Sequence, residues 1–293
     1  MQHTILGAGG IGGLVGAVLA HGGEQVTMVV RPEALHRHPM GLWLESKFGT
    51  FTTRVKVTAE VNEPADILWI TVKATQLDAA LKGISADAPV RYVVPLLNGV
   101  DHVKVLRERF GHDRVIPATI AVESERTAPG VIVHRSPFAR FNAAESGHPV
   151  LHHVTDLFSA FGFECRYIAN ESTLLWSKLA FLAPLALSTT AAGVPVGGVL
   201  SDPARKAKLE ACIREACAVA IASGAELDAD KLLAAVNVLP APMRSSMQKD
   251  VDAGLPPELD AIAGPILRGA AQHGLRASAT TELVETIKQK VKV

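Results

Sequence analysis

One lysine lies in an otherwise apolar stretch past the middle of the chain. The run LLWSKLAFLAPLAL, residues 174–187, contains Lys178 among residues that are almost all apolar. Moving an ammonium group into an apolar environment costs several kcal/mol unless the charge is paired or its pKa falls. Lys178 therefore either borders water, pairs with a carboxylate from elsewhere in the chain, or takes part in proton transfer.

A second group with chemical potential is the glycine-rich run ILGAGGIGG near the N-terminus. Its GxGxxG spacing follows a predicted strand at His3–Leu6 and opens a predicted helix. In a dinucleotide-binding loop the first glycine permits a tight turn, the second lets the pyrophosphate approach the backbone, and the third packs the helix on the strand. We expect the cofactor-binding residues of this loop to be Gly7, Gly9, Gly10, Ile11 and Gly12.

The residue after the second predicted strand, Gln25–Val30, indicates which dinucleotide is bound. An NAD-binding domain ordinarily has an Asp or Glu there for the ribose, whereas this chain has Arg31. A guanidinium group can pair with a 2′-phosphate and stack on adenine. The sequence therefore predicts NADP(H); the alternative, a solvated arginine that opens a loop, leaves the missing acid unexplained.

Two more predicted strands end in polar residues. Ile67–Val72 is followed by Lys73, and Tyr92–Leu97 is followed by Asn98. Ligands of open α/β sheets bind beyond the carboxyl ends of the strands. We therefore expect Lys73 and Asn98 to lie at the cofactor crevice.

The elements that must position these residues fall into two regions. Residues 1–169 alternate short strands with helices, including a strand at Val115–Ala121 and an inserted hairpin of Gly41–Ser46 and Phe51–Thr58, with further strands and one helix after Gly130. Residues 170–293 contain only helix-period segments. The predicted fold class is α/β: an N-terminal Rossmann-type, doubly wound sheet in 1–169 binds the dinucleotide, and an all-helical C-terminal domain covers 170–293, to which the family resemblance given below adds the roles of substrate binding and dimerisation.

Composition excludes several classes of function. Lys plus Arg and Asp plus Glu number 29 each, so the chain has no net charge with which to bind nucleic acid or an anionic membrane. Three cysteines without CxxC spacing suit reduced thiols in a cytoplasm. No metal site is expected, because no HExxH pattern or carboxylate-flanked pair accompanies the histidines. The histidines considered are His36, His38, His148, His152 and His153.

The order of these motifs resembles the ketopantoate reductase family, the 2-dehydropantoate 2-reductases. The motifs are GxGxxG, an arginine after the second strand, VK and NG after the next core strands, and W-x-K in an apolar helix. The later run SSMQKDVDAGLPPELD is similar to the family's Ser-Met, Asp and Glu-x-Asp block, with Ser246, Asp250, Glu258 and Asp260 in matching positions. The similarity extends over essentially the whole chain.

The resemblance implies a role for each matching residue. Lys178 corresponds to the general acid that gives a proton to the carbonyl oxygen of a 2-oxo acid while hydride arrives from NADPH. Glu258 corresponds to the carboxylate that pairs with this lysine, and Ser246 to a ligand of the substrate carboxylate. Asn98 is expected near both substrate and cofactor. We expect Lys178 to line a cleft between the domains, where partial burial lowers its pKa. The positions matched on the cofactor side are Arg31, Lys73 and Asn98.

The chain departs from the family at two positions on the lysine helix. Asparagines that the family places four and eight residues after the lysine correspond here to Leu182 and Ala186, and Pro184 lies between them. These apolar residues predict a substrate with a more apolar tail than ketopantoate. The hydroxyl-rich residues of LSTTAAG, or a water, are the alternative source of a polar lining.

Two other functions stay open at this point. A non-catalytic NADP(H)-binding sensor or interaction protein would explain the loss of both asparagines, whereas retention of Lys178, Ser246 and Glu258 favours an enzyme. A β-hydroxyacid dehydrogenase shares a lysine on a helix but would ordinarily place further polar residues on the same face. The expected partner is a small 2-oxo acid, and the oligomeric state, with a homodimer as one arrangement, is left open.

Overall fold

A computed structural model describes residues 1–85 and 88–291. The described chain divides into two compact units. The sheet unit comprises Met1–Leu97 and His102–Ala169, and the helical unit comprises Asn98–Asp101 and Asn170–Val293. The short segment Asn98–Asp101 was expected in the first domain, but it packs with the helical unit.

The sheet unit is built on a five-stranded parallel sheet. Its strand order is β5-β2-β1-β6-β7, and all four neighbouring pairs run parallel. The apolar central strands are buried on both faces, as covering helices require. This confirms the predicted fold class. The strands are β1 (Gln2–Leu6), β2 (Gln25–Val29), β5 (Lys56–Thr58), β6 (Ala65–Ile70) and β7 (Val90–Pro95).

Two smaller sheets complete this unit. The four-stranded sheet has the order β4-β3-β10-β9, and the three-stranded sheet has the order β12-β11-β8. The strands of the first are β3 (Gly41–Ser46), β4 (Gly49–Arg54), β9 (Ser124–Ala128) and β10 (Val131–His134). Those of the second are β8 (Ala118–Ala121), β11 (Arg140–Ala144) and β12 (Glu164–Ile168).

The expected hairpin strand Phe51–Thr58 is two strands. β4 pairs with β3 as expected, but Lys56–Thr58 pairs with β2 in the parallel sheet. Between them Val55 is buried, and its backbone N–H donates to the carbonyl of Met40 at 3.2 Å. Burial of Val55 at this point turns the chain from one sheet to the other.

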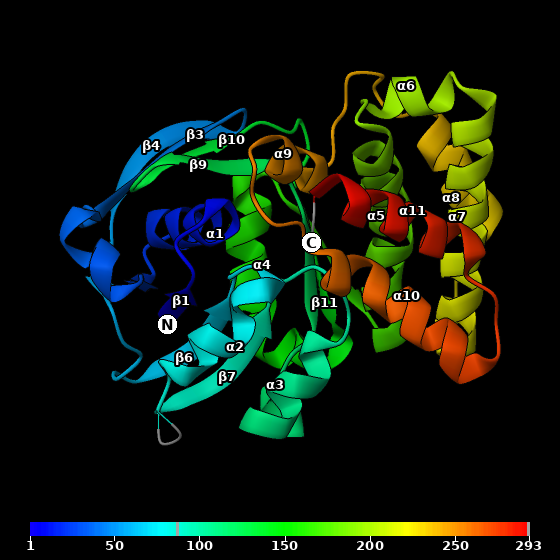
Figure 1. Cartoon of the computed structure of the whole chain (residues 1–293). Coiled ribbons are helices and arrows are strands. Elements are labelled where there is room, and N and C mark those ends of the chain that lie inside the picture. The colour runs from blue at the N-terminus through cyan, green and yellow to red at the C-terminus, as the bar shows by residue number, and fades with distance from the viewer. Residues whose placement is uncertain (86–87, 292–293) are drawn as a thin grey trace. The chain divides into compact units, whose positions relative to one another are not determined.

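Helix α1 (Gly10–His21) lies between the parallel sheet and the four-stranded sheet (Figure 1). Its glycines allow this close packing: a Cβ atom at Gly13 would lie 2.2 Å from the Ile132 side chain, and one at Gly16 would lie 2.8 Å from Met28. The glycine-rich sequence therefore shapes both faces of the helix. The other helices of the unit are α2 (Leu77–Lys82), α3 (His102–Phe110) and α4 (His148–Phe161).

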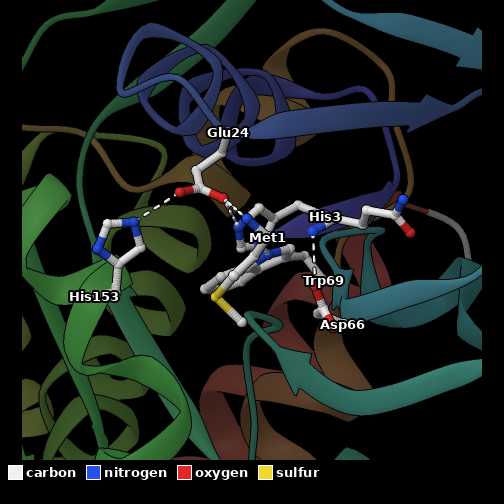
Figure 2. A network of polar contacts seen from close by, with 7 residues as sticks. Met1, His3, Glu24, Asp66, Trp69 and His153 are labelled. Atoms are coloured by element: carbon white, nitrogen blue, oxygen red, sulfur yellow. Dashed lines mark hydrogen bonds and ion pairs between the residues drawn. The ribbon is translucent and has the colours of Figure 1, made fainter.

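A polar network, buried at His3 and Trp69 and half exposed at His153, connects α4 with the sheet (Figure 2). The indole N–H of Trp69 donates to Nδ1 of His3 at 3.1 Å, so the ring proton of neutral His3 is on Nε2. That nitrogen lies 3.4 Å from a Glu24 carboxylate oxygen, and the other oxygen is 2.7 Å from Nε2 of His153. His153 lies on the surface, and its side chain is half exposed where it contacts Glu24.

The helical unit is assembled around α5 (Glu171–Ala192), which contacts α6, α7, α9, α10 and α11. The Asn170 side chain caps its first turn by accepting from the Thr173 N–H. Within the described residues α5 alone is long and apolar enough to cross a membrane, yet 72% of its most apolar window is buried, as in a core helix. The other helices are α6 (Val196–Leu200), α7 (Pro203–Ala222), α8 (Ala229–Asn237), α9 (Ser246–Asp252), α10 (Leu259–His273) and α11 (Ser278–Val291).

Candidate functional site

The glycine-rich loop connects β1 to α1, and two of its glycines are required by the backbone. Gly7 has φ +113°, which disfavours any residue with a side chain, and a Cβ there would lie 2.8 Å from the Val72 backbone nitrogen. A Cβ at Gly12 would lie 2.0 Å from the carbonyl oxygen of Gly7. The loop is thus folded tightly against the sheet.

Space is left open at one point of this loop. A Cβ at Gly9, the N-cap residue of α1, would have no atom within 4 Å, whereas one at Gly10 would lie 2.2 Å from the Ser124 carbonyl oxygen. No side chain caps the helix, and its first turn carries no acidic residue. The first-turn N–H groups, which no side chain caps, and the open space over Gly9 fit a pyrophosphate. Ile11 is partly buried and packs on the core of the sheet unit.

Arg31 and Lys73 lie just after β2 and β6, at the carboxyl edge of the parallel sheet. Lys73 is partly buried. The Arg31 side chain is 78% exposed, and its Nε is 3.5 Å from Oε1 of Glu33. Glu33 was not among the expected site residues, although an acidic residue so close to Arg31 bears on the choice of cofactor.

Lys178 lies on α5 within the helical unit and is only partly accessible to solvent. Burial lowers the pKa of its ammonium group to about 8, and the neighbouring Glu258 carboxylate opposes that shift. A group with this pKa is mostly protonated at neutral pH and can still release its proton readily. Lys178 therefore has the acidity that a proton donor needs.

Glu258 interacts with Lys178, and Asn98 interacts with Glu258. Glu258 is the N-cap residue of α10 and is only 8% exposed. The Asn98 Nδ2 donates to its Oε2 at 3.4 Å, and the charge of Glu258 acts on Lys178. The structure thus brings three of the predicted site residues together within the helical unit.

Ser246 is the first residue of α9, and its side chain is exposed. Among the described residues it has no hydrogen-bond partner. Its neighbour Ser245 is buried, accepts from the Gln248 N–H, and shares a 2.9 Å hydrogen bond with the Thr189 hydroxyl on α5. Ser245 therefore fastens α9 to α5, which leaves the Ser246 hydroxyl available to a ligand.

The two apolar replacements on α5 differ in exposure. Leu182, one turn after Lys178, is partly exposed, whereas Ala186 is fully buried in the core of the helical unit. Leu182 is therefore the replacement that can contact a ligand. The hydroxyls of Ser188, Thr189 and Thr190 are also buried.

Across residues 1–85 and 88–291, no three His, Cys, Asp or Glu side chains gather as ligands for a metal ion. The three cysteines are free thiols. Cys212 and Cys217 lie in the core of the helical unit, where burial raises the pKa of both. They fill space in that core.

Comparison with known proteins gives matches over both units. The family model for ketopantoate reductase PanE/ApbA matches residues 3–145, and the model for the C terminal of the same enzyme matches residues 171–291. A 2-dehydropantoate 2-reductase of Caulobacter vibrioides is 28% identical over 289 residues, which cover 96% of each chain.

Solved structures agree with these matches. A PanE/ApbA family ketopantoate reductase from Ralstonia eutropha superposes with a TM-score of 0.87 at 24% identity, covering 100% of this chain and 99% of the other. A D-mandelate dehydrogenase bound to NADH and anilino(oxo)acetate has the same fold, with a TM-score of 0.86, 19% identity and the same coverage. These matches, with the glycine-rich loop and the all-helical second unit, show that the chain belongs to the ketopantoate reductase family of oxidoreductases, which reduce 2-oxo acids with a nicotinamide dinucleotide.

Proposed function

We propose that this protein reduces a 2-oxo acid to the 2-hydroxy acid with NADPH. The observation that carries the proposal is Lys178, a partly buried lysine with a pKa of about 8 beside the buried carboxylate of Glu258. An ammonium group held in this way suits the donation of one proton to an oxygen on which negative charge develops. A lysine kept only for packing would have no need of a buried carboxylate.

The glycine-rich loop would hold the cofactor. The N–H groups at the start of α1 and the open space over Gly9 would bind the pyrophosphate, and Lys73 would neutralise part of its charge. Arg31 would pair with the 2′-phosphate, because its side chain is exposed and its contact with Glu33 is a weak surface pair. When bound, NADPH supplies the hydride.

The helical unit would supply the remaining groups. Lys178 gives its proton to the carbonyl oxygen, and Glu258 keeps the lysine charged and accepts a hydrogen bond from the new hydroxyl. Ser246 would bind the substrate carboxylate, since its hydroxyl is exposed and uncommitted among the described residues. Asn98 donates to Glu258 and so keeps that carboxylate in place.

The substrate tail would be apolar at the position that Leu182 contacts. A hydroxyl group placed against this side chain loses its hydrogen bonds to water, at a cost of about 1–3 kcal/mol. We therefore propose a 2-oxo acid with a branched aliphatic or aromatic tail, with ketopantoate itself as the alternative. A cytoplasmic location and a homodimer stay predictions.

Oxidation of NADPH against a panel of 2-oxo acids tests the proposal. The panel contains ketopantoate, 2-oxoisovalerate and phenylpyruvate, each also tried with NADH, and light scattering on the same preparation reports the oligomeric state. We expect turnover of at least one 2-oxo acid and a higher kcat/KM with NADPH. Tight NADPH binding without turnover of any member would instead favour a cofactor-binding sensor.

A further inference from the structure

Arg268 on α10 binds two carboxylates that flank the candidate site residues. Its Nη1 lies 2.6 Å from Oδ1 of Asp260, and its Nη2 lies 2.5 Å from Oδ2 of Asp101. Asp260 comes two residues after Glu258, and Asp101 comes three residues after Asn98. One guanidinium group therefore connects the segment that carries Asn98 with the first turn of the helix that Glu258 caps.

Local sequence pattern does not predict this arrangement, because Arg268 is far from Asp101 along the chain. Asp101 directly precedes the first residue of α3 along the chain, and its carboxylate pairs with Arg268. The hydrogen bond to Asp260 is the main cause that raises the pKa of the guanidinium, and the hydrogen bond to Asp101 raises it further. Burial of the group acts in the opposite direction. Arg268 therefore stays charged under all working conditions.

The backbone of the two segments is also in close contact. A Cβ atom at Gly99 would lie 2.5 Å from the carbonyl oxygen of Ala261, and Gly99 has φ +88°. That carbonyl lacks its usual helical donor, because Pro265 has no N–H to offer. The segment Asn98–Asp101 thus lies directly on the first turn of α10, and any shift of one moves the other.

The contacts lead from Arg268 to the proton donor. Arg268 holds Asp101 and Asp260 by hydrogen bonds, and these two residues lie in the segments that carry Asn98 and Glu258. The Asn98 amide in turn donates to Glu258 over a long distance of 3.4 Å. Glu258 then sets the charge next to Lys178. Because the Asn98 contact is long, it depends on the two segments staying in register.

We propose that Arg268 is a positioning residue that holds Asn98 and Glu258 in place around Lys178. The inference rests on the proposed function, in which Lys178 is the proton donor. Exposed ion pairs contribute little to stability, and all three charged groups here are at least half exposed. Catalysis is more sensitive, since small displacements of an acid or its partner can cost about a hundred-fold in rate.

The test compares Arg268→Gln with a matched control, Arg214→Gln. Arg214 pairs with Asp230 at 3.3 Å on the surface of the same unit, away from the residues assigned to the site. We expect Arg268→Gln to lower kcat about ten-fold with an unchanged NADPH dissociation constant and melting temperature, and Arg214→Gln to change none of these. Asp101→Asn, which removes one arm only, should give a smaller loss of kcat.

A double-mutant cycle separates positioning from other effects. In a Glu258→Gln background the substitution Arg268→Gln should cause no further loss of kcat, because the carboxylate it positions is gone. An equal loss in both backgrounds, or native kcat in Arg268→Gln, would overturn the proposal.

A readout independent of turnover keeps this test distinct from that of the proposed function. The ¹⁵N NMR signal of the Lys178 ammonium, assigned by its disappearance in Lys178→Arg, can be followed with pH. Arg268→Gln should lower the pH at which this signal titrates, since Glu258 no longer faces the lysine. If the native protein turns over no 2-oxo acid, the proposed function fails, and an unchanged titration in Arg268→Gln would overturn the positioning role by itself.

Discussion

At the scale of single residues, Lys178 combines two features that a stable core does not need together. It lies in an apolar helix, and burial lowers its pKa to about 8 against the pull of Glu258. Partial burial of the ammonium group costs free energy that an apolar residue at this position would not lose. The lysine is therefore best explained by a chemical role that an apolar residue cannot have. Its effect should therefore appear in the rate of reaction more than in stability.

Lys178→Met should lower kcat by roughly 10²–10⁴-fold, the usual contribution of a positioned acid. Methionine keeps the length of the side chain and removes the charge, so the fold should persist. The NADPH dissociation constant, measured by fluorescence titration, should stay near the native value. In the native protein kcat for reduction should fall as the pH rises through about 8, because the ammonium group then loses its proton; a rate that rises across this range would contradict the role of Lys178 as an acid.

In the proposed function, Arg31 and its neighbour Glu33 set the preference for NADPH over NADH. A charge-assisted pair with the 2′-phosphate is worth about 1.5–3 kcal/mol, so Arg31→Ala should weaken NADPH roughly ten- to a hundred-fold and leave NADH nearly unchanged. Isothermal titration calorimetry with both cofactors checks this. Glu33→Gln serves as the companion variant and should strengthen NADPH slightly, since Arg31 loses its competing partner at 3.5 Å. Equal affinity of the native protein for NADPH and NADH would refute the assignment.

At the scale of elements, two neighbouring glycines in the loop between β1 and α1 should have different roles, Gly9 in cofactor binding and Gly10 in packing. Gly9→Ala should fold normally, because its Cβ meets no atom, yet occupy the space proposed for the pyrophosphate. NADPH should bind at least about ten-fold more weakly, equivalent to about 1.4 kcal/mol. Gly10→Ala should instead destabilise the protein by about 1–3 kcal/mol, because its Cβ would clash with the Ser124 carbonyl. Calorimetry and thermal unfolding of both variants distinguish the two effects, and native NADPH affinity in Gly9→Ala would rule out the proposed phosphate position.

The partly exposed face of α5 should control substrate preference. Leu182→Asn offers a hydrogen bond to a polar tail, so the ratio of kcat/KM for ketopantoate to that for 2-oxoisovalerate should rise about ten-fold or more. Ala186→Asn is the control, since it places an amide in the core and should lower stability by about 1–3 kcal/mol without improving ketopantoate. If the native protein already prefers ketopantoate widely and Leu182→Asn does not increase that preference, the apolar-tail substrate is wrong.

Local patterns predicted the elements better than the contacts between them. The strand β1, the glycine-rich loop and the all-helical unit follow from periodicity and spacing, which short segments carry by themselves. The division of Phe51–Thr58 into two strands depends on burial of Val55, and the membership of Asn98–Asp101 in the helical unit depends on contacts with α10. Neither is encoded in local pattern. The pairing of Arg268 with Asp101 was missed for the same reason.

At the scale of the whole molecule, 29 basic residues balance 29 acidic residues. We therefore expect long-range charge repulsion to contribute little to the pH dependence of the free energy of unfolding. Single buried groups should then dominate, and His3 is one of them in the network of Figure 2. Burial, only partly opposed by Glu24, lowers the pKa of His3 to about 4 from 6.5. The folded protein holds this imidazole neutral with its Nδ1 accepting from Trp69.

This pKa shift makes the protein less stable in mild acid. Above pH 6.5 His3 is neutral in both the folded and unfolded states, so its full contribution to stability is present. As the pH falls from 6.5 toward 4 the unfolded chain takes up a proton that the folded chain does not, and up to about 3 kcal/mol of stability is lost. His3→Asn, whose side-chain oxygen can still accept from Trp69, should flatten the dependence of melting temperature on pH between about 4.5 and 6.5, whereas His112→Asn, on the exposed surface, should not. Calorimetric melting curves at each pH check this, and parallel curves for His3→Asn and the native protein would show that His3 titrates alike in both states.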